Sequence, residues 1–97
     1  MTNKYYVYML ECADGSYYIG MTNDPERRLA EREEGGDPTA YTYLRRPVCM
    51  VWYDAFQSPT AAIEVEKQIK GWNRKKKQAL VDGRFDLLPE LSKSKKE

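Results

Sequence analysis

Tyrosine, arginine, lysine and carboxylate side chains must carry any acid–base or metal chemistry of this 97-residue chain, because it contains no histidine. Histidine general bases, Ser-His-Asp triads and histidine-bound metals are thereby excluded. Two cysteines, Cys12 and Cys49, are too few for a zinc site of their own, and a reducing cytosol disfavours a disulfide between them. Of eight tyrosines, five fall between residues 5 and 18, so this stretch is the first candidate for a reactive site.

Two strands and a tight turn are expected to position these tyrosines. Residues 4–12 are rich in aromatic and β-branched side chains, which is typical of a strand. Asp14-Gly15 is a strong hairpin signal, since glycine accepts the positive φ that such turns need. Residues 16–21 then return as a second strand. Adjacent antiparallel strands can bring Tyr8 and Tyr18 to one face, although their spacing along the chain does not prove it.

Capping signals predict the helices that follow. Asp24 is a good N-cap and Pro25 suits the first helical turn, so a helix should begin there and end at Gly35-Gly36. Its apolar content is thin, so it should cover only the edge of a core. Ser58-Pro59 repeats the start signal for a second helix, and residues 74–81 form a short third one, capped by Asn73.

Apolar patterns predict the remaining packing. Residues 48–56 form a third strand, whose nearly continuous apolar run predicts burial on both faces for part of its length. Ala62, Val65, Ile69 and Trp72 form the core-facing stripe of the second helix. The order β-β-α-β-α-α predicts an α+β domain, a small three-stranded and mostly antiparallel sheet flanked by helices, over residues 1–85. Residues 86–97 are expected to form a C-terminal tail.

The composition fits one globular domain, with 41% hydrophobic and 32% charged residues. No apolar run approaches the roughly 18 residues of a membrane span, and no signal peptide precedes the first strand, so a cytoplasmic location without membrane contact is expected. The formal net charge of +1 conceals an asymmetry, because residues 1–56 sum to −3 and residues 57–97 to +4. The net charge does not by itself indicate a nucleic-acid-binding protein, but it is compatible with a local basic face.

Tyr6-Val7-Tyr8 and Tyr18-Ile19-Gly20, on paired strands, resemble the two motifs of the GIY-YIG nuclease superfamily. Arg28 stands eight residues beyond the glycine, as the arginine of that family does. Glu66 matches the metal-binding glutamate on the family's later helix. The resemblance covers about residues 4–82 and is closest to the small stand-alone bacterial YhbQ-like proteins, which Tyr41-Thr42 and residues 45–47 also match.

The resemblance implies a metal-dependent endonuclease that hydrolyses DNA phosphodiester bonds with one divalent ion, Mg²⁺ or Mn²⁺. Glu66 would hold the metal, which is plausible for a lone carboxylate because Mg²⁺ keeps several waters. Arg28 would donate to phosphate oxygens. Tyr18 is the first choice as base, with Tyr8 positioning the water or sharing the role. A phenol with a pKa near 10 can do this only where nearby cations acidify it.

DNA, branched or damaged, is the expected partner, in repair or recombination, and a protein partner for targeting is also considered. The residues expected to contact nucleic acid are Arg27, Arg32, Tyr41, Arg45, Arg46, Lys70 and Arg74.

Each of these residues also has an ordinary structural explanation. The tyrosines could be strand and core residues, Arg28 a surface charge, and Glu66 half of an exposed pair with Lys70. The sequence also departs from the family, with Tyr6 for the first glycine and Arg32 where a histidine is common. A nucleic-acid-binding module that does not cleave, and a partner-binding protein with neither activity, therefore remain as alternatives.

Overall fold

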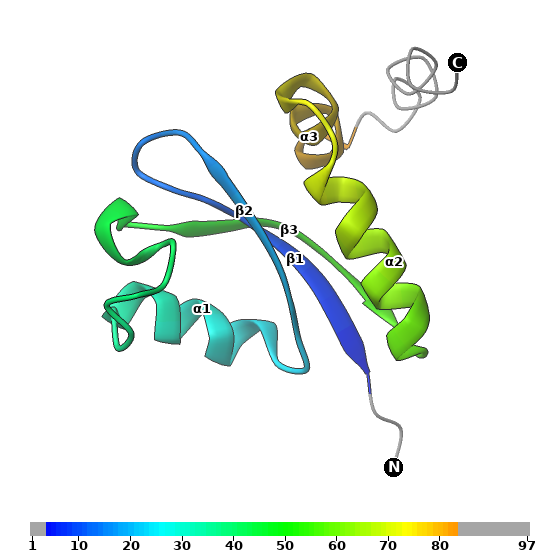
Figure 1. Cartoon of the computed structure of the whole chain (residues 1–97), viewed down its shortest axis with the longest axis horizontal. Coiled ribbons are helices and arrows are strands. Elements are labelled where there is room, and N and C mark those ends of the chain that lie inside the picture. Colours follow the sequence, from blue (N-terminus) through cyan, green and yellow to red (C-terminus); the bar gives the residue numbers. More distant parts are fainter. Residues whose placement is uncertain (1–3, 84–97) are drawn as a thin grey trace.

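The computed structural model describes residues 4–83, which form one antiparallel sheet with helices on both faces (Figure 1). The strand order is β2-β1-β3, and the fold is α+β, as predicted. The elements are β1 (Tyr5–Glu11), β2 (Tyr17–Thr22), α1 (Pro25–Glu34), a short 3-10 turn η1 (Tyr43–Arg45), β3 (Cys49–Phe56), α2 (Pro59–Lys70) and α3 (Arg74–Val81).

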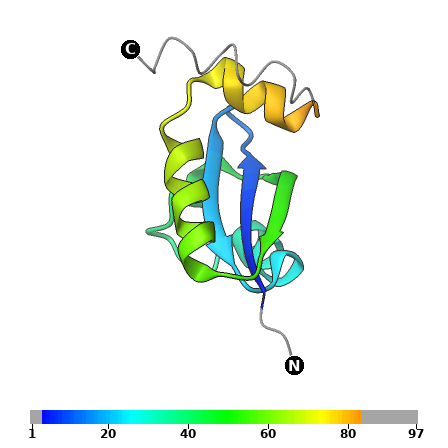
Figure 2. The ribbon, with the colours of Figure 1, turned by 90° about the vertical axis from the view of Figure 1, so that its right-hand side faces the viewer.

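Strand β1 lies at the centre of the sheet, and its alternation separates two cores. Val7 and Met9 face α2 and α3, where they pack with Ile19, Ala62 and Ile69 of the larger core. The figures show α2 and α3 along this face, with α2 beside β2 (Figure 2).

The opposite face of β1 carries Tyr8 and Leu10, which form a smaller core with Cys12 and Val48. Leu29 of α1 packs against this core but is only half-buried, and α1 contributes no buried residue. This confirms the expectation that α1 covers only an edge. The two candidate tyrosines, Tyr8 and Tyr18, therefore lie on the more thinly covered face of the sheet.

The expected burial of the third strand on both faces is wrong. None of the residues of β3 is buried, and Cys49 and Tyr53 are exposed. The reason is the strand order, which leaves β3 at an edge. Its half-buried apolar residues pack from one side only, Met50 against the smaller core and Trp52 against the larger.

Local signals position the helices as predicted. The Asp24 side chain accepts a hydrogen bond from the Arg27 amide (3.1 Å), and Gly35 ends α1 with φ +70°. The Asn73 side chain caps α3 by accepting from the Lys76 amide (2.9 Å). Within residues 4–83, none of the helices has the length and apolar character needed to span a bilayer. The proposed tail, residues 86–97, lies outside the described residues.

Candidate active site

Tyr8 and Tyr18 lie on the same face of the sheet, with ring centroids 6.2 Å apart. The register explains their proximity, because Tyr8 pairs with Gly20 and Tyr18 with Leu10, which places the two tyrosines diagonally across β1 and β2. Tyr8 is fully buried and Tyr18 is half-buried. The predicted meeting of the two motif tyrosines is thus confirmed.

Gly20 makes room for the Tyr8 ring. A Cβ at this position would lie 2.5 Å from Tyr8 Oη and 2.7 Å from Tyr8 Cζ, closer than real Cβ atoms approach. The glycine of the second motif therefore allows the tyrosine ring of the first to lie against the backbone of β2. This confirms the expectation that Gly20 permits a close approach.

Two arginines of α1 border the tyrosines. Arg28 and Arg32 are one helical turn apart, and the Arg32 guanidinium carbon lies 5.6 Å from the centroid of the Tyr18 ring. Arg28 Nε donates to Glu31 Oε1 at 3.1 Å, and 27% of the Arg28 side chain is exposed. With Glu31, Gly36 and Asp37, the two arginines line a hollow of about 400 Å³, which we call the arginine hollow.

The hydroxyl of Tyr8 is buried and forms no hydrogen bond of good geometry among the described residues, and the same is true of Arg32 Nε. The Arg28 and Arg32 side chains nevertheless lie close enough to interact with the Tyr8 phenol. Burial, and then the neighbouring Tyr18, raises the pKa of the Tyr8 phenol, and Arg28 and Arg32 only partly oppose this. Burial would lower the pKa of the Arg32 guanidinium, but the phenols of Tyr8 and Tyr18 raise it above its usual value. At neutral pH the site therefore holds a neutral Tyr8 beside two cations.

Tyr41 extends the site from the loop before β3. Its ring stacks on Tyr18, with centroids 5.8 Å apart and planes at 21°, and 42% of Tyr41 is exposed. The Arg45 guanidinium carbon lies 3.9 Å from the centroid of the Tyr41 ring. Arg45 also forms an ion pair with Asp14, with Nε 3.3 Å from the carboxylate. Two residues predicted to bind nucleic acid, Tyr41 and Arg45, are thus linked to Tyr18 in one continuous stack.

Glu66 is not joined to this group. It lies on α2, which packs on the other face of the sheet, and its carboxylate pairs with Lys70 Nζ at 3.3 Å. Within residues 4–83, neither a hydrogen bond nor an ion pair links Glu66 to Tyr8, Tyr18 or Arg28. The structure thus brings together three of the four predicted catalytic residues.

Glu66 can hold a divalent metal only if most of the other ligands of the ion are water molecules. Within the described chain, no group of three carboxylate or thiol side chains is arranged to enclose a metal. The Glu66 side chain is 19% exposed and offers oxygen ligands. Mg²⁺ commonly binds through one or two carboxylates while keeping water and phosphate ligands, so a single glutamate is compatible with it.

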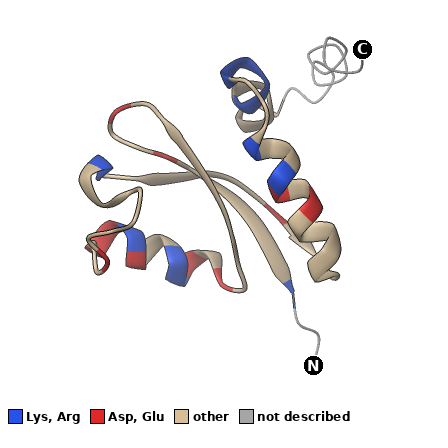
Figure 3. Ribbon diagram, viewed as in Figure 1, with Lys and Arg blue, Asp and Glu red and all other residues tan. Residues whose placement is uncertain are grey.

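Other predicted contact residues lie in separate environments. Arg74 of α3 donates to the Gly15 carbonyl (2.6 Å) and lies 4.8 Å from the Tyr17 ring centroid, so it anchors the hairpin. Arg74 is the first of the basic residues that gather on α3 (Figure 3). Arg27 pairs with Glu31 at 3.6 Å. The remaining predicted contacts are Lys70, paired with Glu66, and Arg46, whose guanidinium carbon lies 4.6 Å from the Tyr43 ring centroid.

Sequence reasoning did not identify the roles of Asp14 and Glu31. Asp14 orients Arg45 from the hairpin turn, and Glu31 holds Arg28 at the arginine hollow. The i, i+3 spacing of Arg28 and Glu31 on one helix could have predicted their ion pair. The sequence could not have predicted the ion pair of Asp14 with Arg45, because it depends on how the loop before β3 folds back.

Residues 4–79 match the GIY-YIG catalytic domain family. The chain belongs to the GIY-YIG family. This is a nuclease family, and the matched stretch includes Tyr8, Tyr18, Arg28 and Glu66. The predicted membership, and the predicted similarity to small stand-alone members, are both confirmed.

Relatives of the GIY-YIG chain are similar over most of their length. A UPF0213 protein of Haloquadratum walsbyi is 40% identical over 87 residues, which are 90% of this chain and 97% of the relative. A UPF0213 protein of Bacillus pumilus is 39% identical over 80 residues, 82% of this chain and 81% of the relative.

Solved structures of two relatives share the fold. The solution NMR structure of a UPF0213 protein from Bacillus halodurans is 41% identical, with a TM-score of 0.54, and covers 81% of this chain and 83% of that one. The solution NMR structure of a protein from E. faecalis is 38% identical, with a TM-score of 0.59, over 88% and 92% of the two chains.

Proposed function

We propose that this GIY-YIG protein is an endonuclease that hydrolyses DNA phosphodiester bonds with the help of one Mg²⁺ or Mn²⁺ ion. The supporting observation is the buried, unpartnered Tyr8 hydroxyl beside Tyr18 and the arginine hollow. A buried polar group without a partner costs about 1–3 kcal/mol, and such a group in a native protein calls for a functional explanation. A water or phosphate oxygen bound during the reaction supplies one.

Arg28 is placed to hold the scissile phosphate. Its guanidinium lies at the arginine hollow with only partial exposure, and Glu31 fixes its Nε atom. The remaining guanidinium donors can bind two phosphate oxygens and stabilise the negative charge that develops during hydrolysis. Arg32 adds a second positive charge beside Tyr18.

The two tyrosines take different roles. Burial raises the pKa of Tyr8, so its hydroxyl stays protonated and can donate a hydrogen bond to a phosphate oxygen or orient a water. Tyr18 is half-buried and borders the cationic Arg32. To act as base it must first release its own phenolic proton to solvent, and the resulting phenolate, beside the Arg32 cation, then accepts the proton of the attacking water.

Glu66 is the proposed metal ligand. Glu66 would hold the divalent ion, which would supply Lewis-acid stabilisation of the phosphate and of the leaving oxygen. To serve in the same reaction as Tyr18, Glu66 must exchange its pairing with Lys70 for metal coordination when DNA binds. Cleavage therefore requires both the ion and Glu66, whereas DNA binding requires neither of them.

The test is nicking of supercoiled plasmid and cutting of a branched DNA by purified protein with Mg²⁺ or Mn²⁺. Wild type should form metal-dependent products, and Arg28→Ala should lower the rate by about 10²–10³-fold, the usual cost of losing one transition-state donor. Lys67→Ala is the matched control, because it also removes one positive charge but from an exposed position on α2. Equal rates for Arg28→Ala and wild type would refute the assignment.

Nucleic-acid binding without cleavage is the second candidate. Its support is the separation of Glu66 from the tyrosines and the exposed stack of Tyr41 and Arg45, which offers a cation and an aromatic edge to DNA. It predicts an affinity for DNA that falls with salt, with no metal-dependent products.

A further inference from the structure

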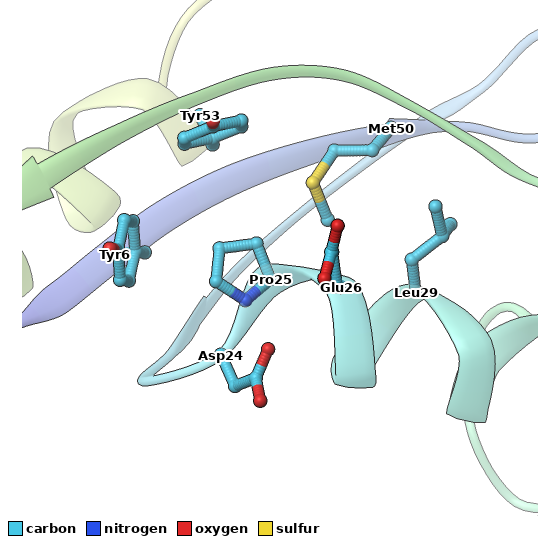
Figure 4. A pocket seen from close by; sticks show the side chains of 7 residues that line it. All are labelled: Tyr6, Asp24, Pro25, Glu26, Leu29, Met50 and Tyr53. Carbon is cyan, nitrogen blue, oxygen red and sulfur yellow. The ribbon is translucent and has the colours of Figure 1, made fainter.

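A second hollow, which shares no residue with the arginine hollow, lies between the start of α1 and strands β1 and β3 (Figure 4). Its volume is about 330 Å³, at the lower end of the roughly 300–1,000 Å³ of ligand pockets. The size suits one side chain better than a whole element of a partner. We call it the acidic-aromatic pocket; its lining residues are Tyr6, Asp24, Pro25, Glu26, Leu29, Met50 and Tyr53.

Two tyrosines form one wall of this pocket. Tyr6 and Tyr53 pack edge to face, with centroids 5.9 Å apart and planes at 67°. Tyr53 is 57% exposed, which is unusual for a large aromatic residue in the middle of a strand. An open tyrosine face attracts cations through the negative potential of its ring.

Carboxylates complete the lining. Glu26 is exposed, extends from the first turn of α1 toward the strands beside Met50, and forms no ion pair or hydrogen bond within residues 4–83 (Figure 4). Asp24 uses one oxygen to cap α1. Glu26 also complements the helix dipole, but that role requires no aromatic wall opposite it.

We infer that the acidic-aromatic pocket binds an arginine side chain from a basic segment of a protein partner. A guanidinium can stack on Tyr53 while it donates two hydrogen bonds to the Glu26 carboxylate, and Pro25, Leu29 and Met50 would cover its aliphatic stem. This combination of a flat cation and a carboxylate favours arginine over lysine. The inference goes beyond nuclease activity and does not depend on it.

Nucleic acid is a poor occupant of the same pocket. Neither lysine nor arginine lines it, and its two carboxylates would repel a phosphate backbone. The basic residues that border the tyrosines belong instead to the arginine hollow. The two hollows therefore have opposite charge preferences on one small domain.

The test is an NMR titration of the full chain with the blocked tripeptide acetyl-Gly-Arg-Gly-amide, compared with the same peptide carrying citrulline, the neutral analogue of arginine. The arginine peptide should shift the backbone amides of Glu26, Leu29 and Tyr53 in a saturable way, whereas the citrulline peptide should not. Tyr53→Ala should weaken binding by about two- to fivefold, the range for an exposed cation–aromatic contact. Glu26→Gln should also weaken binding, because it removes the negative charge and one hydrogen-bond acceptor for the guanidinium.

Two controls distinguish this pocket from general attraction of a cation. Glu33→Gln removes one negative charge from the same helix at an exposed position away from the pocket, and it should leave binding unchanged. Tyr53→Phe keeps the ring and should bind nearly as wild type, so it reports on the pocket even if Tyr53→Ala fails to fold. Equal binding of the citrulline peptide, equal weakening by Glu33→Gln, or shifts of the pocket amides by a DNA oligonucleotide instead would overturn the inference.

Discussion

The ring of Tyr8 lies directly over Gly20, and no side chain larger than hydrogen fits between them. This contact links the two sequence motifs physically, since the glycine of one defines the position of the phenol of the other. It also explains how a fully buried tyrosine can present its hydroxyl to Tyr18 and the arginines rather than to the sheet interior.

Gly20→Ala should displace Tyr8 and destabilise the fold. Forcing an extra methyl group into a packed site typically costs about 1–3 kcal/mol, so the free energy of unfolding should fall by that amount in a urea titration. Gly36→Ala is the matched control, because nothing lies within 4 Å of a Cβ at that position. If the two variants were equally stable, the close approach of Tyr8 to Gly20 would be wrong.

Tyr8→Phe should separate stability from activity. The variant removes a buried hydroxyl that has no partner, so the free energy of unfolding should equal that of wild type or exceed it by up to about 1–3 kcal/mol, while DNA nicking is lost. In the control, Tyr17→Phe, the hydrogen bond from Tyr17 to Gln78 (2.6 Å) disappears, so stability should fall. A clear loss of stability in Tyr8→Phe would mean that its hydroxyl serves the fold.

Alkaline pH should destabilise wild type more than Tyr8→Phe. The unfolded chain releases the Tyr8 proton near pH 10, whereas the native protein holds it to higher pH because burial raises the pKa. The native state then binds more protons than the unfolded state, so stability falls as pH rises above about 10. Unfolding free energies of the two proteins between pH 8 and about 11 test this, and parallel curves would contradict it.

Arg45→Ala should loosen the stack on Tyr18 without unfolding the protein. The variant removes both the guanidinium over Tyr41 and the pairing with Asp14. We expect weaker DNA binding at low salt and altered NMR signals of Tyr18 and Tyr41, with a change in stability below about 1 kcal/mol, as is usual for exposed ion pairs. Arg46→Ala in the same loop should leave the Tyr18 signals unchanged, and the opposite pattern would contradict the assigned stack.

Local signals in the sequence predicted the elements well. Asp14-Gly15 marked the hairpin, and Asp24, Ser58 and Asn73 marked the three helix starts where the structure has them. Each of these signals acts through neighbouring residues only, so reading them required no knowledge of the tertiary fold.

Long-range features could not be predicted in the same way. The apolar run of β3 indicated burial on both faces, but strand order decides which strand is central, and β1 occupies that place. Nothing in the sequence indicated that Arg74 would donate to the Gly15 carbonyl, 59 residues away, while its predicted contact with nucleic acid stays a prediction. The sequence position of a charged side chain does not predict which distant backbone group it will contact in the folded protein.

The sequence motif implies that Glu66 acts together with the tyrosines. Because α2 lies on the other face of the sheet, Glu66 and the tyrosine–arginine group must act on one scissile bond despite their separation.

The most direct measurement of this claim is the DNA nicking rate as a function of Mn²⁺ concentration for wild type, Glu66→Gln and Glu64→Gln. Glu64 is an exposed carboxylate on the same helix and serves as the matched control. A chelator should abolish nicking by wild type, Glu64→Gln should follow the wild-type curve, and Glu66→Gln should show no nicking at any Mn²⁺ concentration at which wild type is active. Wild-type rates in Glu66→Gln, or equal losses in both variants, would contradict this claim.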